Sequence, residues 1–346
     1  MNLVTVVALL LAMTLALGAL LLVARTWTGA RAIGADHPPI GTFVQANGRS
    51  IHHVDRPGNP SLLPIVFVHG ASGNLRDQLE AFGDAFANLP DAQRPRTIFM
   101  DRPGAGYTQR RPGDHDPYEQ ARTVADLLDA LDIPRAVVCG HSYGAGVAAT
   151  FAVAHPDKAA GIALLAPASH PWAGRLVWYY RLVASRAFRT IAAWTIVVPL
   201  GRRMVQAGVD GTFWPDAPTP HYAERTAVPL LLRPAAFLAN AADINHIKAH
   251  AAELSPRYRE ITCPTYICAG ESDAVVRATI HAMGLYRAIA HARMDWAEGV
   301  GHKPDYVLTR RIVDELLRMA APALRVVARG TREGSTAAPK FKDAAE

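Results

Sequence analysis

The predicted fold rests on one stretch of the chain, Val137-Val138-Cys139-Gly140-His141-Ser142-Tyr143-Gly144-Ala145-Gly146. An apolar run leads into a Gly-x-Ser-x-Gly pattern, and an Ala- and Val-rich segment that favours a helix follows it. Between a strand and a helix, this pattern predicts a sharp turn that lifts the serine hydroxyl above the end of a sheet. The two flanking glycines leave room for such a turn because they have no Cβ. The pattern by itself is common, so the rest of the chain must supply a base, a carboxylate and an oxyanion site.

Apolar strands and amphipathic helices alternate on both sides of this stretch. We predict eight strands, at residues 42–46, 51–54, 64–70, 97–101, 135–139, 162–166, 265–270 and 292–296. Helices are predicted over 77–89 and 117–131, directly after Ser142, over 274–290, and in a last amphipathic segment around 307–317. Continuous apolar strands that alternate with helices are typical of a parallel, doubly wound sheet. The chain is therefore predicted to be an α/β protein with a mostly parallel eight-stranded sheet.

Three further segments differ from this alternating pattern. Residues 169–256 are helix-prone, aromatic and rich in arginine, and we predict a helical cap inserted after the sixth strand. The core then comprises residues 42–168 and 257–322. Residues 26–41 are predicted to be a linker, and the Gly-, Ser-, Ala- and Lys-rich tail 323–346 is expected to be disordered.

The N-terminus carries an uncharged run of 22 residues, 3–24, which is long enough to cross a bilayer. A cleaved signal peptide is the alternative, with Ala30-Arg31-Ala32 as a possible cleavage site. Against it, Met1-Asn2 supplies no Lys or Arg before the run. We predict a retained single-pass anchor at residues 1–25. Arg25 and Arg31 follow the run, which predicts a cytoplasmic catalytic domain; a periplasmic, extracellular or secreted domain is the alternative.

Composition and missing motifs exclude several classes of protein. The net charge is +6, and no basic run is interleaved with aromatic residues, so nucleic-acid binding is not expected. The chain has neither a phosphate-binding glycine motif nor His-Glu-x-x-His, and its three cysteines lack zinc or redox spacing. We therefore expect no nucleotide cofactor and no metal. No obligate protein partner is evident.

With these elements in order, the sequence resembles the α/β-hydrolase superfamily over residues 43–319, in its serine-nucleophile, capped, esterase- or lipase-like branch. Four motifs carry the resemblance, in the expected order and at strand ends: His69-Gly70-Ala71-Ser72-Gly73-Asn74, Asp101-Arg102-Pro103-Gly104-Ala105-Gly106, the Ser142 pattern, and Gly270-Glu271-Ser272-Asp273 together with Gly301-His302. The resemblance implies Ser142 as nucleophile and His302, just past the last strand, as base. The histidines at 281 and 291 fall in or beside a helix and are not expected to take part.

The resemblance also implies the remaining parts of the site. Asp273 is predicted to orient His302, with Glu271 as the rival carboxylate. The backbone N–H groups of Ala71 and Tyr143 are predicted to form the oxyanion hole. His69 either braces its own loop or touches substrate. The glycine-rich turn 101–106 is interpreted as a structural brace beside the site.

A serine at this position implies acyl transfer: cleavage of an ester-like bond through an acyl-enzyme, with a small-molecule or lipid ester as substrate. The alternatives that keep the same catalytic triad, Ser142, His302 and Asp273, are a C–C bond hydrolase, an acyltransferase, a peptidase and a perhydrolase. A non-catalytic binding module is the alternative outside enzymes. The aromatic residues of the cap indicate either an apolar substrate or the cap's own core.

Overall fold

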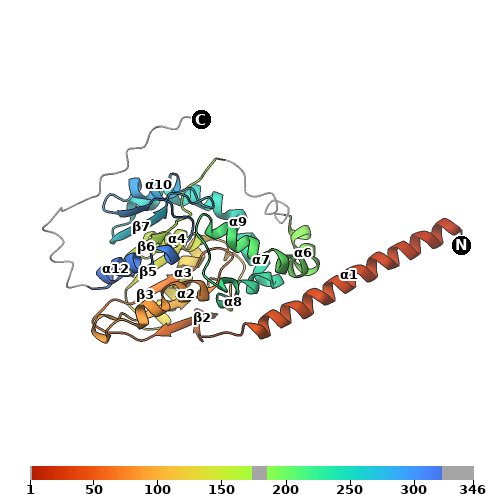
Figure 1. Ribbon diagram of the computed structural model, residues 1–346, viewed down its shortest axis with the longest axis horizontal. Helices are drawn as coiled ribbons and strands as arrows, with labels where there is room; N and C mark the ends of the chain where they lie inside the picture. Colours follow the sequence, from red (N-terminus) through yellow and green to blue (C-terminus); the bar gives the residue numbers. More distant parts are fainter. Residues whose placement is uncertain (1, 174–184, 322–346) are drawn as a thin grey trace.

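A computed structural model describes residues 2–173 and 185–321 of the 346-residue chain. The predicted tail at 323–346 and part of the predicted cap lie outside the described residues. Figure 1 shows a sheet covered by helices on both faces, a group of helices at one end of it, and one long helix that projects away from the rest.

The predicted eight-stranded sheet is confirmed. Its strand order is β1-β2-β4-β3-β5-β6-β7-β8, and only the pairings of β2 with β1 and with β4 are antiparallel. The strands are β1 (Thr42–Ala46), β2 (Arg49–Arg56), β3 (Ile65–Val68), β4 (Thr97–Met100), β5 (Ala136–His141), β6 (Ala159–Leu165), β7 (Thr265–Gly270) and β8 (Arg293–Ala297). The carboxyl ends of its parallel strands meet at one edge, where ligands bind in open α/β sheets.

Two hydrophobic cores explain the helices on the faces of the sheet. In β3, Val66 and Val68 belong to the core with α3 (Pro117–Ala130), α4 (Tyr143–Ala154) and α10 (His281–Ala288). Ile65 and Phe67 belong to the opposite core with α2 (Leu75–Ala87) and α12 (Thr309–Ala320). Successive side chains of a strand point to opposite faces, so a fully apolar strand fits only between two layers of helices.

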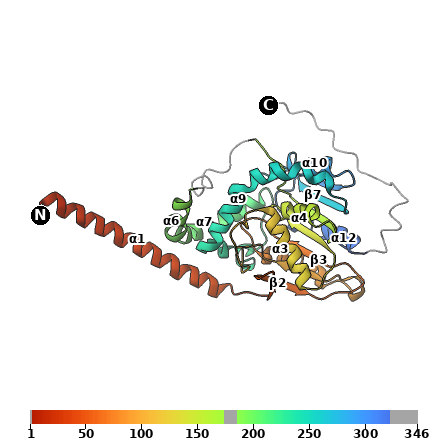
Figure 2. The same ribbon diagram turned by 180° about the vertical axis from the view of Figure 1, so that it is seen from behind.

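The helical insertion lies between β6 and β7, as predicted (Figures 1 and 2). Its described helices are α6 (Arg186–Thr195), α7 (Val197–Phe213), α8 (Tyr222–Arg225) and α9 (Pro234–Leu254). Short 3-10 helices lie at Val228–Leu232 and Ser255–Glu260 within the same region, and at Asp91–Gln93 before β4. The helix predicted over 274–290 is shorter, because only His281–Ala288 forms α10. A four-residue helix, α11 (Pro304–Val307), precedes α12.

The N-terminal helix α1 (Leu3–Asp36) has 34 residues and corrects one predicted boundary. Residues 26–36, predicted to be linker, continue the helix. The reason is tertiary packing: Thr26 and Ile33 are buried, and Ile33 shares a small core with Val198 of α7 and Leu230. By length and composition α1 could cross a membrane, a property that signal sequences share; its most apolar window has a mean hydropathy of 2.8 and is not buried.

Candidate active site

Ser142 occupies the sharp turn between β5 and α4, with φ 54° and ψ −116°. Residues other than glycine adopt this conformation only when the surrounding chain enforces it. The neighbouring glycines make the turn possible: a Cβ on Gly140 would lie 2.2 Å from the carbonyl oxygen of Gly144, and a Cβ on Gly144 would lie 2.2 Å from that of Val68. The predicted sharp turn at Ser142 therefore depends on close backbone packing, which leaves no room for a side chain at positions 140 and 144.

Ser142, His302 and Asp273 form a continuous hydrogen-bonded chain. His302 Nε2 lies 3.0 Å from Ser142 Oγ, and His302 Nδ1 lies 2.7 Å from Asp273 Oδ2. The second oxygen of Asp273 accepts the backbone N–H groups of Val275 and Val276, each at 2.8 Å. With the proton of His302 on Nδ1, the carboxylate of Asp273 accepts three hydrogen bonds. Nε2 of His302 is then free to accept a hydrogen bond from the hydroxyl of Ser142.

The other titratable residues considered from the sequence are exposed or contact other groups. Glu271, the rival carboxylate, is exposed. His281 accepts the backbone N–H groups of Ser169 and His170, and His291 contacts the carbonyl oxygen of Cys263. The structure therefore brings the predicted Asp273 and His302, and not these residues, into hydrogen-bonding contact with each other and with Ser142.

The two backbone N–H groups of the predicted oxyanion hole belong to residues close to Ser142 in the structure. The N–H groups of Ala71 and Tyr143 donate to no acceptor within the part of the chain that the structure describes. Tyr143 follows the serine directly. A Cβ added to Gly70 would lie 3.2 Å from the Cβ of Ser142, so the loop that carries Ala71 is in contact with the turn at Ser142. Unpaired donors are uncommon in protein interiors and invite a functional explanation.

His69 braces its own loop, which decides between the two interpretations of this residue. Its side chain is fully buried; Nδ1 lies 2.8 Å from the carbonyl oxygen of Gly70, and Nε2 accepts the backbone N–H of Arg102 at 3.0 Å. Burial, assisted by the charge of Arg102, lowers the pKa of His69 to about 4. A neutral imidazole with both nitrogens occupied ties the loop after β3 to the loop after β4.

A model of the alpha/beta hydrolase family matches residues 65–314. The chain belongs to the alpha/beta hydrolase family. Among its curated relatives is a 2-hydroxy-6-oxo-2,4-heptadienoate hydrolase from Pseudomonas putida, 31% identical over 36% of this chain and 44% of the relative. With other curated relatives the match spans about a third of their length, 31 to 35%.

Solved structures show the same hydrolase fold. An esterase from Exiguobacterium antarcticum has a TM-score of 0.63 at 18% identity, over 81% of this chain and 99% of the esterase. A structure described as a membrane phospholipase A has a TM-score of 0.62 at 20% identity, over 90% of this chain and 98% of that chain. At such identities the likeness concerns the fold.

Arg102 joins the loop after β3, which carries Ala71, to the cap, a role that its place in the predicted brace did not reveal. Its guanidinium donates to the carbonyl oxygens of His69 and Gly70 at 3.1 and 3.2 Å, and pairs with Asp243 of α9 at 2.8 Å. It also lies over the ring of Tyr143, 4.5 Å from the centroid. Arg102 and Asp243 are both buried, so the charge of the arginine is balanced by the cap.

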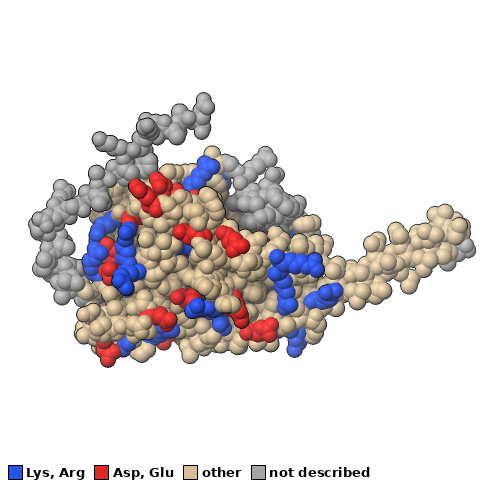
Figure 3. Space-filling view, in the orientation of Figure 1, with Lys and Arg blue, Asp and Glu red and all other residues tan. Residues whose placement is uncertain are grey.

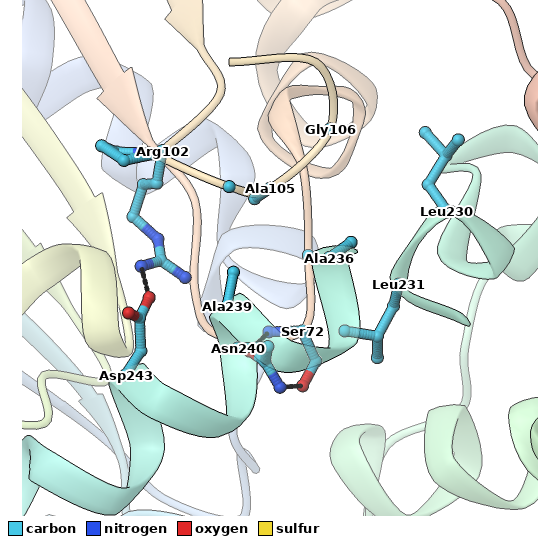
Figure 4. A pocket seen from close by; sticks show the side chains of 13 residues that line it. Ser72, Arg102, Ala105, Gly106, Leu230, Leu231, Ala236, Ala239, Asn240 and Asp243 are labelled. Atoms are coloured by element: carbon cyan, nitrogen blue, oxygen red, sulfur yellow. Dashed lines mark hydrogen bonds and ion pairs between the residues drawn. The ribbon is translucent and has the colours of Figure 1, made fainter. Parts of the chain in front are cut away.

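A small pocket lies between the loop after β4 and helix α9 of the hydrolase (Figure 4). Ser72 and Asn240 hydrogen-bond along one side of it, and Arg102 and Asp243 pair on another. The apolar wall includes Leu230 and Leu231 together with small residues such as Ala236 and Ala239. The same polar contacts that close the cap onto the core therefore line the pocket.

A buried lysine lies behind the candidate triad, and sequence reasoning missed it. Lys303 is 1% exposed and its Nζ lies 2.9 Å from Asp77 and 3.1 Å from Asp305. Beside it, His141 Nε2 lies 2.9 Å from the carbonyl oxygen of His302. The two carboxylates and His141 are close enough to suggest a cation site. The ammonium of Lys303 already contacts both carboxylates.

Three buried histidines predict how the stability of this hydrolase depends on pH. Burial is the main cause that lowers the pKa values of His69, His141 and His281 to about 4, from an ordinary value of 6.5. Below pH 6.5 the unfolded chain therefore binds more protons than the folded one. The free energy of unfolding is expected to keep its full value above pH 6.5. It should fall as the pH is lowered toward 4, by about 1.4 kcal/mol per pH unit for each histidine.

Denaturant unfolding followed by circular dichroism, across this pH range, measures the slope. His281→Gln is expected to reduce this slope by the equivalent of up to one bound proton. Protonation of His281 Nδ1 would break the two hydrogen bonds that it accepts from backbone N–H groups. His221→Gln is the matched control, since that side chain is 78% exposed. Equal slopes in the parent and in His281→Gln would contradict the assignment.

Proposed function

We propose that this hydrolase cleaves an ester-like bond of an apolar small molecule or lipid through an acyl-enzyme on Ser142. The observation that carries the proposal is the chain of contacts from Ser142 Oγ to His302 at 3.0 Å and from His302 to Asp273 at 2.7 Å. A serine hydroxyl is a weak nucleophile at neutral pH, and such a base within hydrogen-bonding distance activates it.

The geometry supports a two-step reaction. As Ser142 Oγ attacks the carbonyl carbon, its proton passes to His302 Nε2, and Asp273 stabilises the imidazolium. The carbonyl oxygen becomes an oxyanion, and in this proposal the N–H groups of Ala71 and Tyr143 bind it; each such donor typically contributes about 3 kcal/mol to the stability of the transition state. The bond to the alcohol then breaks and the alcohol takes the proton from His302. Water, activated by the same base, releases the acid in the second step.

We also propose that α1 is retained as a single-pass membrane anchor, with the hydrolase domain on the cytoplasmic side; release of a secreted domain by cleavage is the alternative. The uncharged run before Arg25 supports an anchor. The likeness to the structure described as a membrane phospholipase A covers 90% of this chain and agrees with a lipid ester as substrate.

A second candidate reaction is hydrolysis of a carbon–carbon bond by the same three residues. The match to the 2-hydroxy-6-oxo-2,4-heptadienoate hydrolase favours it, as does the likeness to a meta-cleavage product hydrolase from Pseudomonas fluorescens at a TM-score of 0.63. An ester panel and a 2-hydroxy-6-oxo-dienoate, tested side by side, distinguish the two reactions.

Labelling of the full-length protein with a fluorophosphonate tests the nucleophile directly. We expect a single adduct on the peptide that carries Ser142, and parallel loss of activity toward p-nitrophenyl esters. Ser142→Ala should abolish the labelling, whereas the exposed Ser61→Ala should retain it. A folded protein that takes up no label at Ser142 would overturn the proposed function and favour a non-catalytic binding module.

A further inference from the structure

Helix α6 exposes a stripe of large apolar side chains. Phe188, Ile191 and Trp194 are 43, 62 and 39% exposed. Their spacing of three residues places them along one side of the helix. The opposite side, with Ala192 and Ala193, is buried.

Helix α7 carries a second stripe, which begins in the turn between the two helices. Ile196, Leu200 and Met204 recur every four residues and are 46, 48 and 56% exposed. On the buried side of α7, Val198 and Val209 face the rest of the protein. Each helix thus exposes large apolar side chains on its outer face in addition to those that it buries, which a cap surrounded by water does not need.

Both stripes lie next to the helix that could cross a membrane. Helix α1 packs against α6 and α7, and a Cβ added to Gly29 of α1 would lie 2.7 Å from a methyl group of Val198. Figures 1 and 2 show α6 at the end of the molecule from which α1 projects. Before Gly29, α1 exposes leucine and valine side chains on all sides. The apolar surface of the span therefore continues onto the cap.

Arginines surround the point where α1 leaves the body. Arg25, Arg31, Arg202 and Arg203 are all exposed. Arg202 donates to the carbonyl oxygen of Gly29 at 3.3 Å, which fixes its guanidinium beside the helix. Figure 3 shows Lys and Arg side chains gathered in this region. Cations at the edge of an apolar face complement the anionic headgroups of a bilayer.

We propose that the outer face of α6 and α7 is a membrane-docking face, which lies in the headgroup layer of the bilayer that α1 crosses and which exposes the hydrolase to lipid substrates. The proposal rests on the anchor included in the proposed function. A lipid surface is the occupant because the face is continuous with the span and is bordered by arginines. Docking through this face holds the cap, and not the opposite side of the sheet, against the substrate-bearing surface.

Lipid quenching of a fluorophore at single introduced cysteines tests this orientation. The three native cysteines are buried, so an NBD label reacts selectively with Ile191→Cys or Met204→Cys. Val307→Cys is the control, because Val307 is 43% exposed on α11, outside the cap. The full-length protein is placed in phosphatidylethanolamine–phosphatidylglycerol vesicles that contain a spin-labelled lipid. We expect quenching at positions 191 and 204 to exceed that at 307 several-fold.

Equal quenching at all three positions would overturn the proposal. So would NBD fluorescence at 191 and 204 that is unquenched by lipid and shifts with protein density, because a second copy of the chain would then cover the face.

A second experiment separates docking from catalysis. The double variant Ile191→Glu with Met204→Glu should hydrolyse a lipid ester in vesicles about tenfold more slowly, with unchanged turnover of a soluble ester. Val307→Glu should leave both rates unchanged. Loss of both rates in the double variant contradicts docking, whereas an unmodified chain that cleaves no ester contradicts the proposed function and leaves the quenching result intact.

Discussion

Ser142→Ala is expected to lower kcat for ester hydrolysis by at least about 10⁴-fold, and by roughly 10⁶-fold if the three residues act as a unit. The substitution removes the hydroxyl that lies 3.0 Å from His302 Nε2 and leaves the imidazole and its carboxylate in place. The change should appear in kcat, because the hydroxyl forms its covalent bond only during the reaction. Steady-state kinetics with a p-nitrophenyl ester measure it, with active protein counted by fluorophosphonate titration of the parent.

Two further variants test whether the three residues act as a unit. Asp273→Asn should cost about 10⁴-fold, because an amide at this position no longer favours the tautomer with the proton on His302 Nδ1. The combination of Ser142→Ala with Asp273→Asn should be no slower than Ser142→Ala alone. Additive losses, or a Ser142→Ala variant that retains a tenth of the parent kcat, would exclude the proposed mechanism.

The largest effect on stability is expected from Lys303→Met, which should lower the free energy of unfolding by about 3–5 kcal/mol. The variant leaves Asp77 and Asp305 buried without their shared cation. Burial alone would raise the pKa of Asp77, and the contact with Lys303 instead holds it at about 2. The carboxylate therefore stabilises the fold above about pH 4, and this contribution is lost as the pH falls toward 2.

Denaturant unfolding of the full-length protein in detergent at neutral pH measures the loss. Lys158→Met provides the matched control: Lys158 pairs with Asp129, whose side chain is 63% exposed, and its removal should cost less than about 1 kcal/mol. Neutralising both carboxylates in the Lys303→Met background, by Asp77→Asn and Asp305→Asn, should recover much of the loss. If Lys303→Met unfolds at the same denaturant concentration as Lys158→Met, the ion cluster does not stabilise the fold.

The parts of the fold that the sequence predicted are those set by local pattern. Residue spacing predicts the apolar strands, their alternation with helices and the turn at Ser142. Each of these elements is set by how its own side chains are buried and by how its own backbone groups are hydrogen-bonded. The pairing of Asp273 with His302 required the family resemblance, since 29 residues separate them and only the sheet brings the two loops together.

The parts that were missed depend on contacts between distant segments. From the sequence, Lys303 next to His302 is expected at the surface. Nothing in the neighbouring residues indicates that it forms a buried ion pair with Asp77, which lies 226 residues earlier. Likewise, the helix beyond residue 25 is held by packing of Ile33 against Val198, which the Gly- and Ala-containing segment itself does not specify. Tertiary packing decided both outcomes, and single-sequence patterns do not record it.

Arg102 couples two regions of the protein that perform different tasks. Its guanidinium holds the carbonyl oxygens of the loop that carries Ala71, and the same group is neutralised by Asp243 on α9 of the cap. An outward movement of α9 must either break this ion pair or pull on the loop. If a ligand that favours one position of the cap changes the affinity of this loop for a bound group, thermodynamic linkage requires that group to shift the cap by the same free energy.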